Sequence, residues 1–388
     1  MTSRILFVDH SAVLGGGELS LRDISRHYRE TSTVLLLSDG PFRELLESEG
    51  VRVQIVHAGS SLLTVRRDGS GRSVAAAAEL AKLTWKLARI AGQFDLLYAN
   101  SQKAFVVSAL AGRLACRPVI WHLRDILSDA HFGHGNIRLV TTLANLCATR
   151  VIANSQATAS AFIAQRGREA KVRVIHNGID GAEFARVTES EALEVRHQLG
   201  LGNRRLVGVF GRFHPWKGQH VALEVLARLP DAHGLFVGAA LFGEEDYAAH
   251  VRRRARELGL EHRVHFLGFR RDLPQLMRAV DLVLHTAEAP EPFGRVIVEG
   301  MLAARPVVAA RAGGALEIVR EGVTGLLVPP GDVDAFAAAV AGLLADPARR
   351  AALGAAAYEH ACREFSLDAM LRGVADEIAA AVAGNRPK

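Results

Sequence analysis

Residues 291–301 read EPFGRVIVEGM, and two glycine-containing runs follow, AGGALEIV at 312–319 and GVTGLLVP at 322–329. Between the first two runs, the apolar segment Val307–Ala309 predicts a buried strand. The second run predicts a tight turn into a helix, and the third predicts a turn followed by a strand over Leu326–Val328. This order of elements is typical of a parallel sheet covered by helices.

Two glutamates in the first run, Glu291 and Glu299, are eight positions apart. We expect a helix that starts at Pro292 or Phe293, so that Glu291 lies on the preceding loop and Glu299 two turns into the helix. A carboxylate in that place can accept two hydrogen bonds from vicinal hydroxyl groups, as a ribose presents them.

The same alternation of short apolar strands and helical patterns extends through the rest of the chain. Further strands are predicted at 206–210, 235–237, 264–266 and 282–284 in the second half, and at 4–8, 33–37, 51–56, 95–99, 118–122, 150–153 and 172–175 in the first. Strands that are apolar throughout indicate a parallel sheet covered on both faces. We therefore predict an α/β protein with two doubly wound, Rossmann-like domains.

The domain limits follow from a break after Asp180. We expect an N-terminal domain at 1–180, a linker at 181–203, a C-terminal domain at 204–365, and a final helix at 366–388 that crosses back to the N-terminal domain.

Composition narrows the class of protein. The 388 residues carry a net charge of +6, and 49% of them are hydrophobic, which is typical of a globular protein. The three cysteines form neither a zinc motif nor a disulfide framework, and no apolar run is long enough for a signal peptide or a membrane span. These features predict a cytoplasmic location. No basic block contains interleaved aromatic residues, so a nucleic-acid partner is not expected.

One predicted helix has a basic face. Over residues 79–92, Leu80, Leu83 and Leu87 share one side, while Lys82, Lys86 and Arg89 line another beside Trp85. A membrane-surface helix and a core-packed helix with a solvated basic face both fit this pattern, and the second is favoured. Membrane association is therefore not favoured at this point.

Residues 210–219, FGRFHPWKGQ, follow a predicted strand and open a helix. Arg212 and Lys217 then lie beyond the carboxyl end of a strand, where open α/β sheets bind ligands. Two cations beside a helix N-terminus suit a diphosphate, although two solvated surface cations would give the same pattern. A second glycine loop, LGGGE at 14–18, matches neither a dinucleotide fingerprint nor a Walker loop.

Taken together, the run with Glu291 and Glu299, the GGxxEI run and the GxTGxL run resemble those of the retaining glycosyltransferases of family 4. The segment VIHNGID at 174–180 also resembles the hinge motif of that family, with His176 where proline is commoner. The resemblance implies the GT-B fold: an N-terminal acceptor-binding domain and a C-terminal donor-binding domain, both Rossmann-like, that face a central cleft.

The resemblance also implies roles for individual residues. Arg212 and Lys217 match the pair that holds the donor diphosphate, Glu291 matches the carboxylate on the donor sugar, and Glu299 matches the glutamate on the ribose. Further donor-binding candidates are Gly16, Phe293, Gly294, Arg295 and Val296. His122, in WHLRD, matches a histidine close to the transferred sugar, so the catalytic candidates are His122, Arg212, Lys217 and Glu291. Acceptor-binding candidates are Gly17, Glu18, Asn100, His122 and Asp125.

One segment departs from the pattern of the family. After the strand at 235–237 the family often has Gly-x-Gly, whereas this chain reads GAALFG at 238–243. This loop neighbours the expected base pocket, so the base of the nucleotide stays open. Phe269 and Arg270 are the candidates for the wall of that pocket.

These observations predict a retaining glycosyltransferase that moves a sugar from a UDP- or GDP-sugar to a small-molecule or glycan acceptor. No metal and no cofactor are expected, and the nucleotide sugar is a co-substrate. Arg212 and Lys217 would stabilise the leaving diphosphate in place of a metal ion. The alternatives are a nucleotide-sugar epimerase of the same fold and a binding protein that has lost turnover; a dinucleotide-dependent oxidoreductase is disfavoured because its fingerprint is missing.

Overall fold

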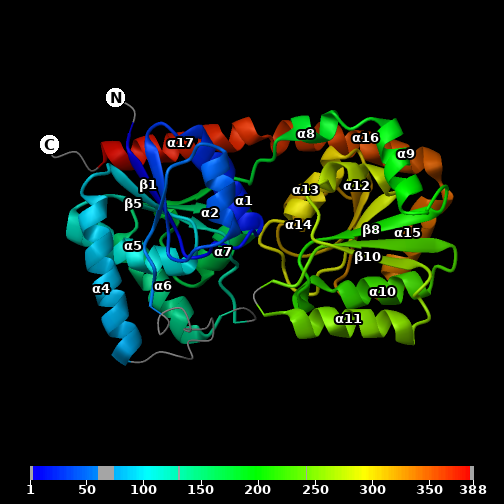
Figure 1. The fold of residues 1–388 in the computed structure, drawn as a ribbon, viewed down its shortest axis with the longest axis horizontal. Coiled ribbons are helices and arrows are strands. Elements are labelled where there is room, and N and C mark those ends of the chain that lie inside the picture. Colours follow the sequence, from blue (N-terminus) through cyan, green and yellow to red (C-terminus); the bar gives the residue numbers. More distant parts are fainter. Residues whose placement is uncertain (1–2, 60–73, 130–131, 242, 385–388) are drawn as a thin grey trace. The chain divides into compact units, whose positions relative to one another are not determined.

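The computed structural model describes residues 3–59, 74–129, 132–241 and 243–384 of the chain (Figure 1). Within it the chain forms two compact units. The first unit contains Met1–Gly178 and Asp368–Lys388, and the second contains Ile179–Leu367. Each unit is built around its own sheet.

The sheet of the first unit is parallel, with the strand order β3-β2-β1-β4-β5-β6-β7. Its strands are β1 (Ile5–Asp9), β2 (Ser32–Leu36), β3 (Val53–Ile55), β4 (Leu96–Ala99), β5 (Val119–Leu123), β6 (Arg150–Ala153) and β7 (Val172–Val174). The strand order reverses at β1, because β2 and β4 pair with its two edges. This reversal creates a switch point between β1 and β4.

The helices of the first unit cover both faces of this sheet. They are α1 (Gly16–His27), α2 (Pro41–Ser48), α4 (Val74–Ala91), α5 (Gln102–Ala115), α6 (His134–Cys147), α7 (Gln156–Ala164) and α17 (Leu367–Ala383). The last helix, α17, lies with this unit although it is the final element of the chain (Figure 1). An ion pair of 3.2 Å between Arg150 Nε and Glu377 Oε2 connects it to β6.

The sheet of the second unit is also parallel, with the order β10-β9-β8-β11-β12-β13. Its strands are β8 (Arg205–Phe210), β9 (Ala232–Val237), β10 (Val264–Gly268), β11 (Leu282–His285), β12 (Val307–Ala310) and β13 (Gly325–Val328). Its helices are α8 (Gly181–Ala185), α9 (Glu189–Gln198), α10 (Gln219–Ala227), α11 (Glu245–Glu257), α12 (Leu273–Ala279), α13 (Arg295–Leu302), α14 (Ala315–Ile318), α15 (Val333–Ala345) and α16 (Pro347–Glu364). The switch point here lies between β8 and β11.

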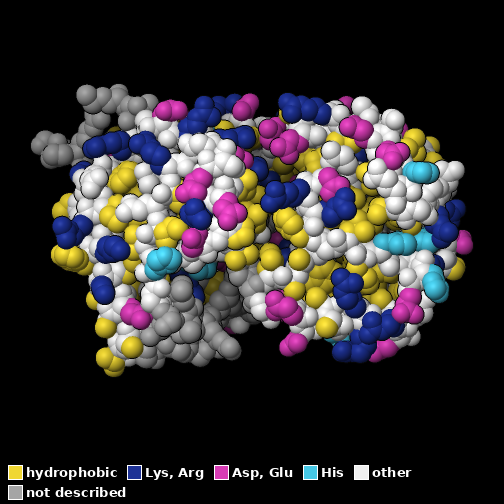
Figure 2. All heavy atoms as spheres, in the orientation of Figure 1, with side chains coloured by type: hydrophobic (Ala, Val, Ile, Leu, Met, Phe, Trp, Pro, Cys, Tyr) yellow, Lys and Arg dark blue, Asp and Glu magenta, His cyan; other side chains and the backbone are white. Residues whose placement is uncertain are grey.

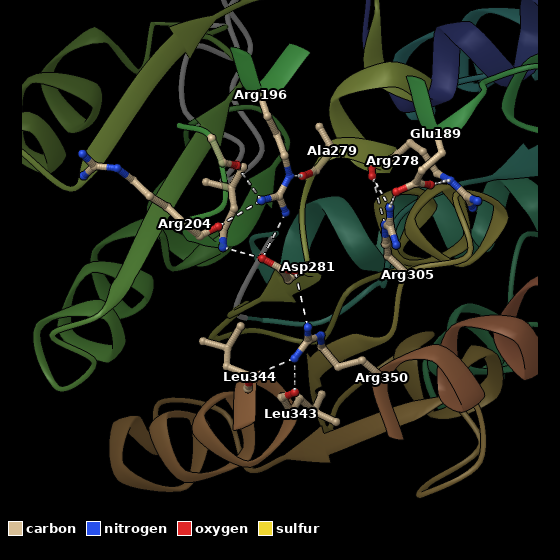
Figure 3. A network of polar contacts seen from close by, with 12 residues as sticks. Glu189, Arg196, Arg204, Arg278, Ala279, Asp281, Arg305, Leu343, Leu344 and Arg350 are labelled. Carbon is tan, nitrogen blue, oxygen red and sulfur yellow. Dashed lines mark hydrogen bonds and ion pairs between the residues drawn. The ribbon is translucent and has the colours of Figure 1, made fainter. Parts of the chain in front are cut away.

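The segment expected to be a linker, 181–203, differs from that expectation. It forms α8 and α9, and both helices belong to the second unit. Figure 3 shows the reason: the Asp281 carboxylate at the start of β11 accepts from Arg196 of α9 at 3.1 Å and pairs with Arg350 of α16 at 3.6 Å. A shared, half-buried carboxylate thus connects α9 to the domain that follows it.

The predicted α/β fold is confirmed, and each strand range predicted from the apolar segments overlaps an observed strand. The start of α13 was predicted wrongly. This helix begins at Arg295, after Gly294 with a φ of 107°, and not at Pro292 or Phe293. Because a left-handed residue cannot continue a helix backwards, Glu299 lies only about one turn into α13. Within the described ranges, no helix combines the length and apolar character needed to cross a membrane.

Candidate functional site

Three side chains meet beside the switch point of the second unit. Lys217 ends the short helical turn Pro215–Lys217 after β8, His285 is the last residue of β11, and Glu291 lies on the loop that follows. Lys217 Nζ donates to Glu291 Oε1 at 2.8 Å and to Oε2 at 2.5 Å, and His285 Nε2 lies 3.2 Å from Oε2. We call Lys217, His285 and Glu291 the charged cluster.

The charged cluster is largely shielded from solvent, with 8% of Glu291 and 6% of His285 exposed. Burial alone would raise the pKa of Glu291, but the Lys217 ammonium and the His285 ring outweigh it and lower the pKa to about 2. Glu291 is therefore ionised at every physiological pH. The ammonium also lies 4.3 Å from the centre of the Trp216 ring, which restricts where Lys217 can move.

Glycines allow the loops around the charged cluster to approach one another. A Cβ on Gly218, whose φ is 67°, would lie 2.0 Å from the Thr286 carbonyl oxygen. A Cβ on Gly313, whose φ is 59°, would lie 2.2 Å from the Glu291 carbonyl oxygen. Any larger residue at either position would push a loop away from the cluster. The glycine run at 312–319 therefore holds the backbone of Glu291 in place.

Glu299, the second glutamate of the motif, lies on the first helix after this loop. Its Oε1 accepts from Arg295 Nε at 2.7 Å, and both side chains are mostly buried. Arg295 Nη1 is buried and has no hydrogen-bond partner among the described residues. The Phe293 ring packs against Phe365, so its side chain belongs to the core and only its backbone remains for a ligand.

Arg212, Phe269 and Arg270 lie on neighbouring loops at the same edge of the sheet. Arg212 is half-buried after β8, and its carbonyl oxygen accepts from Gln219 Nε2 at 2.8 Å. Phe269 is 55% exposed after β10, and Arg270 is held by Asp272 at 2.6 Å. Gly238 N donates to Gly268 O at 2.8 Å and so connects the loop after β9 to that after β10.

The first unit has a polar network of its own, at the carboxyl ends of β1, β4 and β5. Because Val8 pairs with Ala99, Asp9 and Asn100 leave the sheet side by side, and Asn100 donates to the Asp9 carboxylate. Arg124, which follows β5, donates through Nε to Asn100 at 2.7 Å and through Nη1 to Asn177 at 3.0 Å. Gly17 joins the network through its carbonyl oxygen, 3.3 Å from Asn100 Nδ2.

His122 is fully buried in β5, and its neighbours fix its tautomer. Tyr98 Oη lies 2.6 Å and Arg124 Nη2 lies 3.2 Å from the same ring nitrogen, Nδ1. A guanidinium can only donate, so Nδ1 accepts and the proton is on Nε2. Burial and the charge of Arg124 hold the pKa of His122 well below its ordinary value. The Nε2–H group is thus a buried donor with no acceptor among the described residues.

Glu18 lies in the first turn of α1, with its Oε2 close to Gly15; a Cβ on that glycine would be 2.6 Å from it. Burial, and then the negative charge of Asp9, raise the pKa of Glu18 to about 7, against attraction from His10 and Arg124. Gly16 is exposed at the start of α1, and Asp125 is half-buried on the loop after β5. Glu18 therefore titrates near neutral pH.

Stability should depend on pH through Glu18. Because its pKa in the folded state is about 7 against an ordinary 4.5, folding favours the protonated acid, and the unfolding free energy falls as the pH rises between these values. Glu18→Gln should be more stable than the wild type by about 1–3 kcal/mol near pH 8, and the gap should shrink near pH 5. Urea titration at both pH values measures this. A gap of equal size at both would contradict the assigned pKa.

The structure thus brings Lys217 together with Glu291, Arg295 with Glu299, and Asn100 with Gly17. Sequence analysis missed His285, Tyr98 and Arg124, although each lies at or next to the carboxyl end of a predicted strand, which is the signal that could have found them. Among the described residues, no three His, Cys, Asp or Glu side chains are placed to hold a metal ion.

Two family models match the chain one after the other. The model described as Glycosyltransferase Family 4 matches residues 14–183, and that described as Glycosyl transferases group 1 matches residues 192–360. HepE of Anabaena, crystallised with UDP and glucose, is 42% identical, with 98% of this chain and 100% of HepE covered and a TM-score of 0.91. The chain belongs to glycosyltransferase family 4. The family and the GT-B fold implied by the sequence motifs are both confirmed.

Other proteins similar to this chain are more distant. The D-inositol 3-phosphate glycosyltransferase of Mycobacterium marinum is 36% identical over 250 residues, which are 62% of this chain and 53% of that protein. The chain thus spans about half the length of the curated relatives it matches. Sucrose-phosphate synthase of Thermosynechococcus elongatus has a TM-score of 0.82 at 21% identity, with 99% of this chain covered, and so shares the fold.

Proposed function

We propose that this protein is a retaining glycosyltransferase that moves a sugar from UDP-sugar to a hydroxyl group of a small acceptor molecule, without a metal ion. The observation that carries the proposal is the charged cluster beside the switch point of the second sheet, where Lys217 and Glu291 are already paired. An ion pair so placed offers one charge of each sign to a ligand, which suits a donor made of an anionic diphosphate and a hydroxyl-rich sugar.

The choice of UDP is supported by the similarity to HepE. That protein is 42% identical over nearly the whole chain and was also crystallised with UDP-glucose. UDP-glucose is therefore the first donor to test, and a GDP-sugar is the second. Phe269 and Arg270, on the loop after β10, are proposed to border the base because this loop is hydrogen-bonded to the one after β9.

Four candidate site residues of the second unit have a proposed role in transfer. Lys217, with Arg212, neutralises the charge that accumulates on the diphosphate as the bond to the sugar breaks. Glu291 accepts hydrogen bonds from hydroxyl groups of the donor sugar, and Glu299 accepts them from the ribose. The acceptor oxygen attacks the anomeric carbon from the face that the diphosphate leaves, and its proton passes to the departing diphosphate. The configuration at that carbon is thereby kept.

The first unit is proposed to supply His122 to the donor sugar and to bind the acceptor. The buried Nε2–H of His122 lacks an acceptor among the described residues, and a sugar hydroxyl would satisfy it. Gly17, Glu18, Asn100 and Asp125 are the proposed contacts of the acceptor. The names of the curated relatives refer to D-inositol 3-phosphate. For this chain we propose a small polyhydroxy compound as the acceptor.

UDP release should survive removal of metal ions. Incubation with UDP-glucose and an acceptor panel should release UDP at the same rate with and without EDTA, because Arg212 and Lys217 supply the positive charge. A coupled assay of free UDP measures this. Loss of activity in EDTA that magnesium restores would contradict the metal-independent mechanism, and failure of every nucleotide sugar to release nucleotide would contradict the proposed function.

A further inference from the structure

We propose that the exposed face of α4 docks on an anionic lipid surface. This face, called the α4 patch, consists of Lys82, Trp85, Lys86 and Arg89. The proposal concerns binding to a bilayer and is independent of the transfer reaction. In Figure 1, α4 runs along one edge of the first unit.

The α4 patch is one continuous stripe of the helix. Its residues follow the spacing i, i+3, i+4 and i+7, which places them on one side of an α-helix. Leu83 and Leu87 lie on the opposite side and are buried in the core of the first unit. The helix is thus packed on one side, as the sequence favoured, and free on the other to meet a flat surface.

Trp85 is the feature that a merely solvated basic helix does not explain. Its side chain is 60% exposed, whereas Trp121 of the same unit is 1% exposed. The guanidinium carbon of Arg89 lies 4.8 Å from the centre of the Trp85 ring, so a cation already accompanies the aromatic surface. Tryptophan with neighbouring lysine and arginine is the combination found at the headgroup level of bilayers.

Charge points to an anionic surface. Glu79 is the one acidic residue of α4, and it lies three positions before Lys82, at the N-terminal end of the stripe. In the described part of the chain, no carboxylate forms an ion pair with Lys82, Lys86 or Arg89. Figure 2 shows lysine and arginine side chains beside hydrophobic ones along the edge where α4 runs. Three cations around one indole, none of them ion-paired within the described ranges, favour acidic lipid headgroups, and each contributes to the attraction.

A lipid surface accounts for this combination better than nucleic acid or protein. Single-stranded nucleic acid is bound through successive aromatic platforms, and the α4 patch has one aromatic ring. A second protein would be expected to bury a larger apolar centre than one indole. Both remain as outcomes that the experiment separates.

The test is binding of the full chain to vesicles of phosphatidylcholine, with and without phosphatidylglycerol, followed by flotation. The wild type should float with the anionic vesicles only, and salt should weaken the binding. Lys82→Glu/Lys86→Glu should lower the partition constant at least tenfold, because each basic residue near the surface contributes roughly a fivefold effect. Trp85→Ala should also weaken binding, whereas both variants should keep wild-type donor turnover with a soluble acceptor.

The matched control is Arg253→Glu/Arg256→Glu on α11, which makes the same change in net charge on an exposed helix of the second unit. It should bind vesicles as the wild type does. Equal loss by the control, binding to neutral vesicles alone, or no binding would each overturn the proposal. So would concentration-dependent dimers, or binding to oligonucleotides, that the Lys82/Lys86 variant abolishes while vesicle binding stays unchanged.

Discussion

Lys217→Ala should lower kcat about a hundred- to a thousandfold with UDP-sugar as donor. Removing a charged donor aimed at a group that gains charge in the transition state costs this much in other enzymes. Lys217 is well placed for the role because its ammonium is fixed by both oxygens of Glu291 and by the Trp216 ring. Steady-state kinetics against donor concentration measure the change, and near-normal turnover in the folded variant would contradict the assignment.

The same substitution should also affect stability, and a second variant separates the two effects. Without Lys217, the buried carboxylate of Glu291 loses its main partner, and breaking a buried pair costs up to about 3–5 kcal/mol. Lys217→Met/Glu291→Gln removes both charges and should recover most of the stability but none of the activity. Arg228→Ala, which breaks an exposed ion pair with Asp334, is the control and should change neither the stability nor the activity.

Substitution of each of the two glutamates should change a different kinetic constant, kcat for one and KM for the other. Glu291→Gln should lower kcat roughly ten- to a hundredfold, because Glu291 is proposed to contact the sugar, whose charge and shape change during transfer. Glu299→Gln should mainly raise the KM for the donor by a comparable factor, because the ribose is remote from the reacting carbon.

Kinetics of both variants against donor concentration test this pair of roles. Because Glu291 has a pKa of about 2, no pH change in the working range should mimic its substitution. If Glu299 governed turnover and Glu291 governed donor KM, the roles would have to be exchanged. If Glu299→Gln changed neither parameter, its contact with Arg295 would be purely structural.

Much of the fold and part of the site follow from local patterns. Buried parallel strands are apolar throughout. The strands that contain Val207 and Val283 could therefore be predicted without knowing which strands pair with them. Lys217 was a candidate because it follows such a strand, and the resemblance to family 4 added Glu291 to it. The start of α13 could not be predicted in this way. Proline at 292 is a good first helical residue, and only the backbone conformation of Gly294 delays the start of the helix.

The missing partners depend on which strands become neighbours. His285 is an unremarkable strand residue until the pairing of β11 with β8 brings it beside Glu291 and Lys217. Arg124 likewise gains its role only where β5 meets β4, next to Asn100. The helices α8 and α9 looked like a linker because their sequence is polar, and the attachment of α9 depends on Asp281, which is distant in the chain.

The most direct measurement is the anomeric configuration of the first sugar that the protein releases. When an acceptor is absent, slow transfer to water from UDP-glucose can be followed by proton NMR before the free sugar equilibrates. The account predicts UDP and α-glucose as the first products, unchanged in EDTA. β-Glucose as the first product would contradict retention, and a sugar epimerised at another carbon would show that the protein is an epimerase of the same fold.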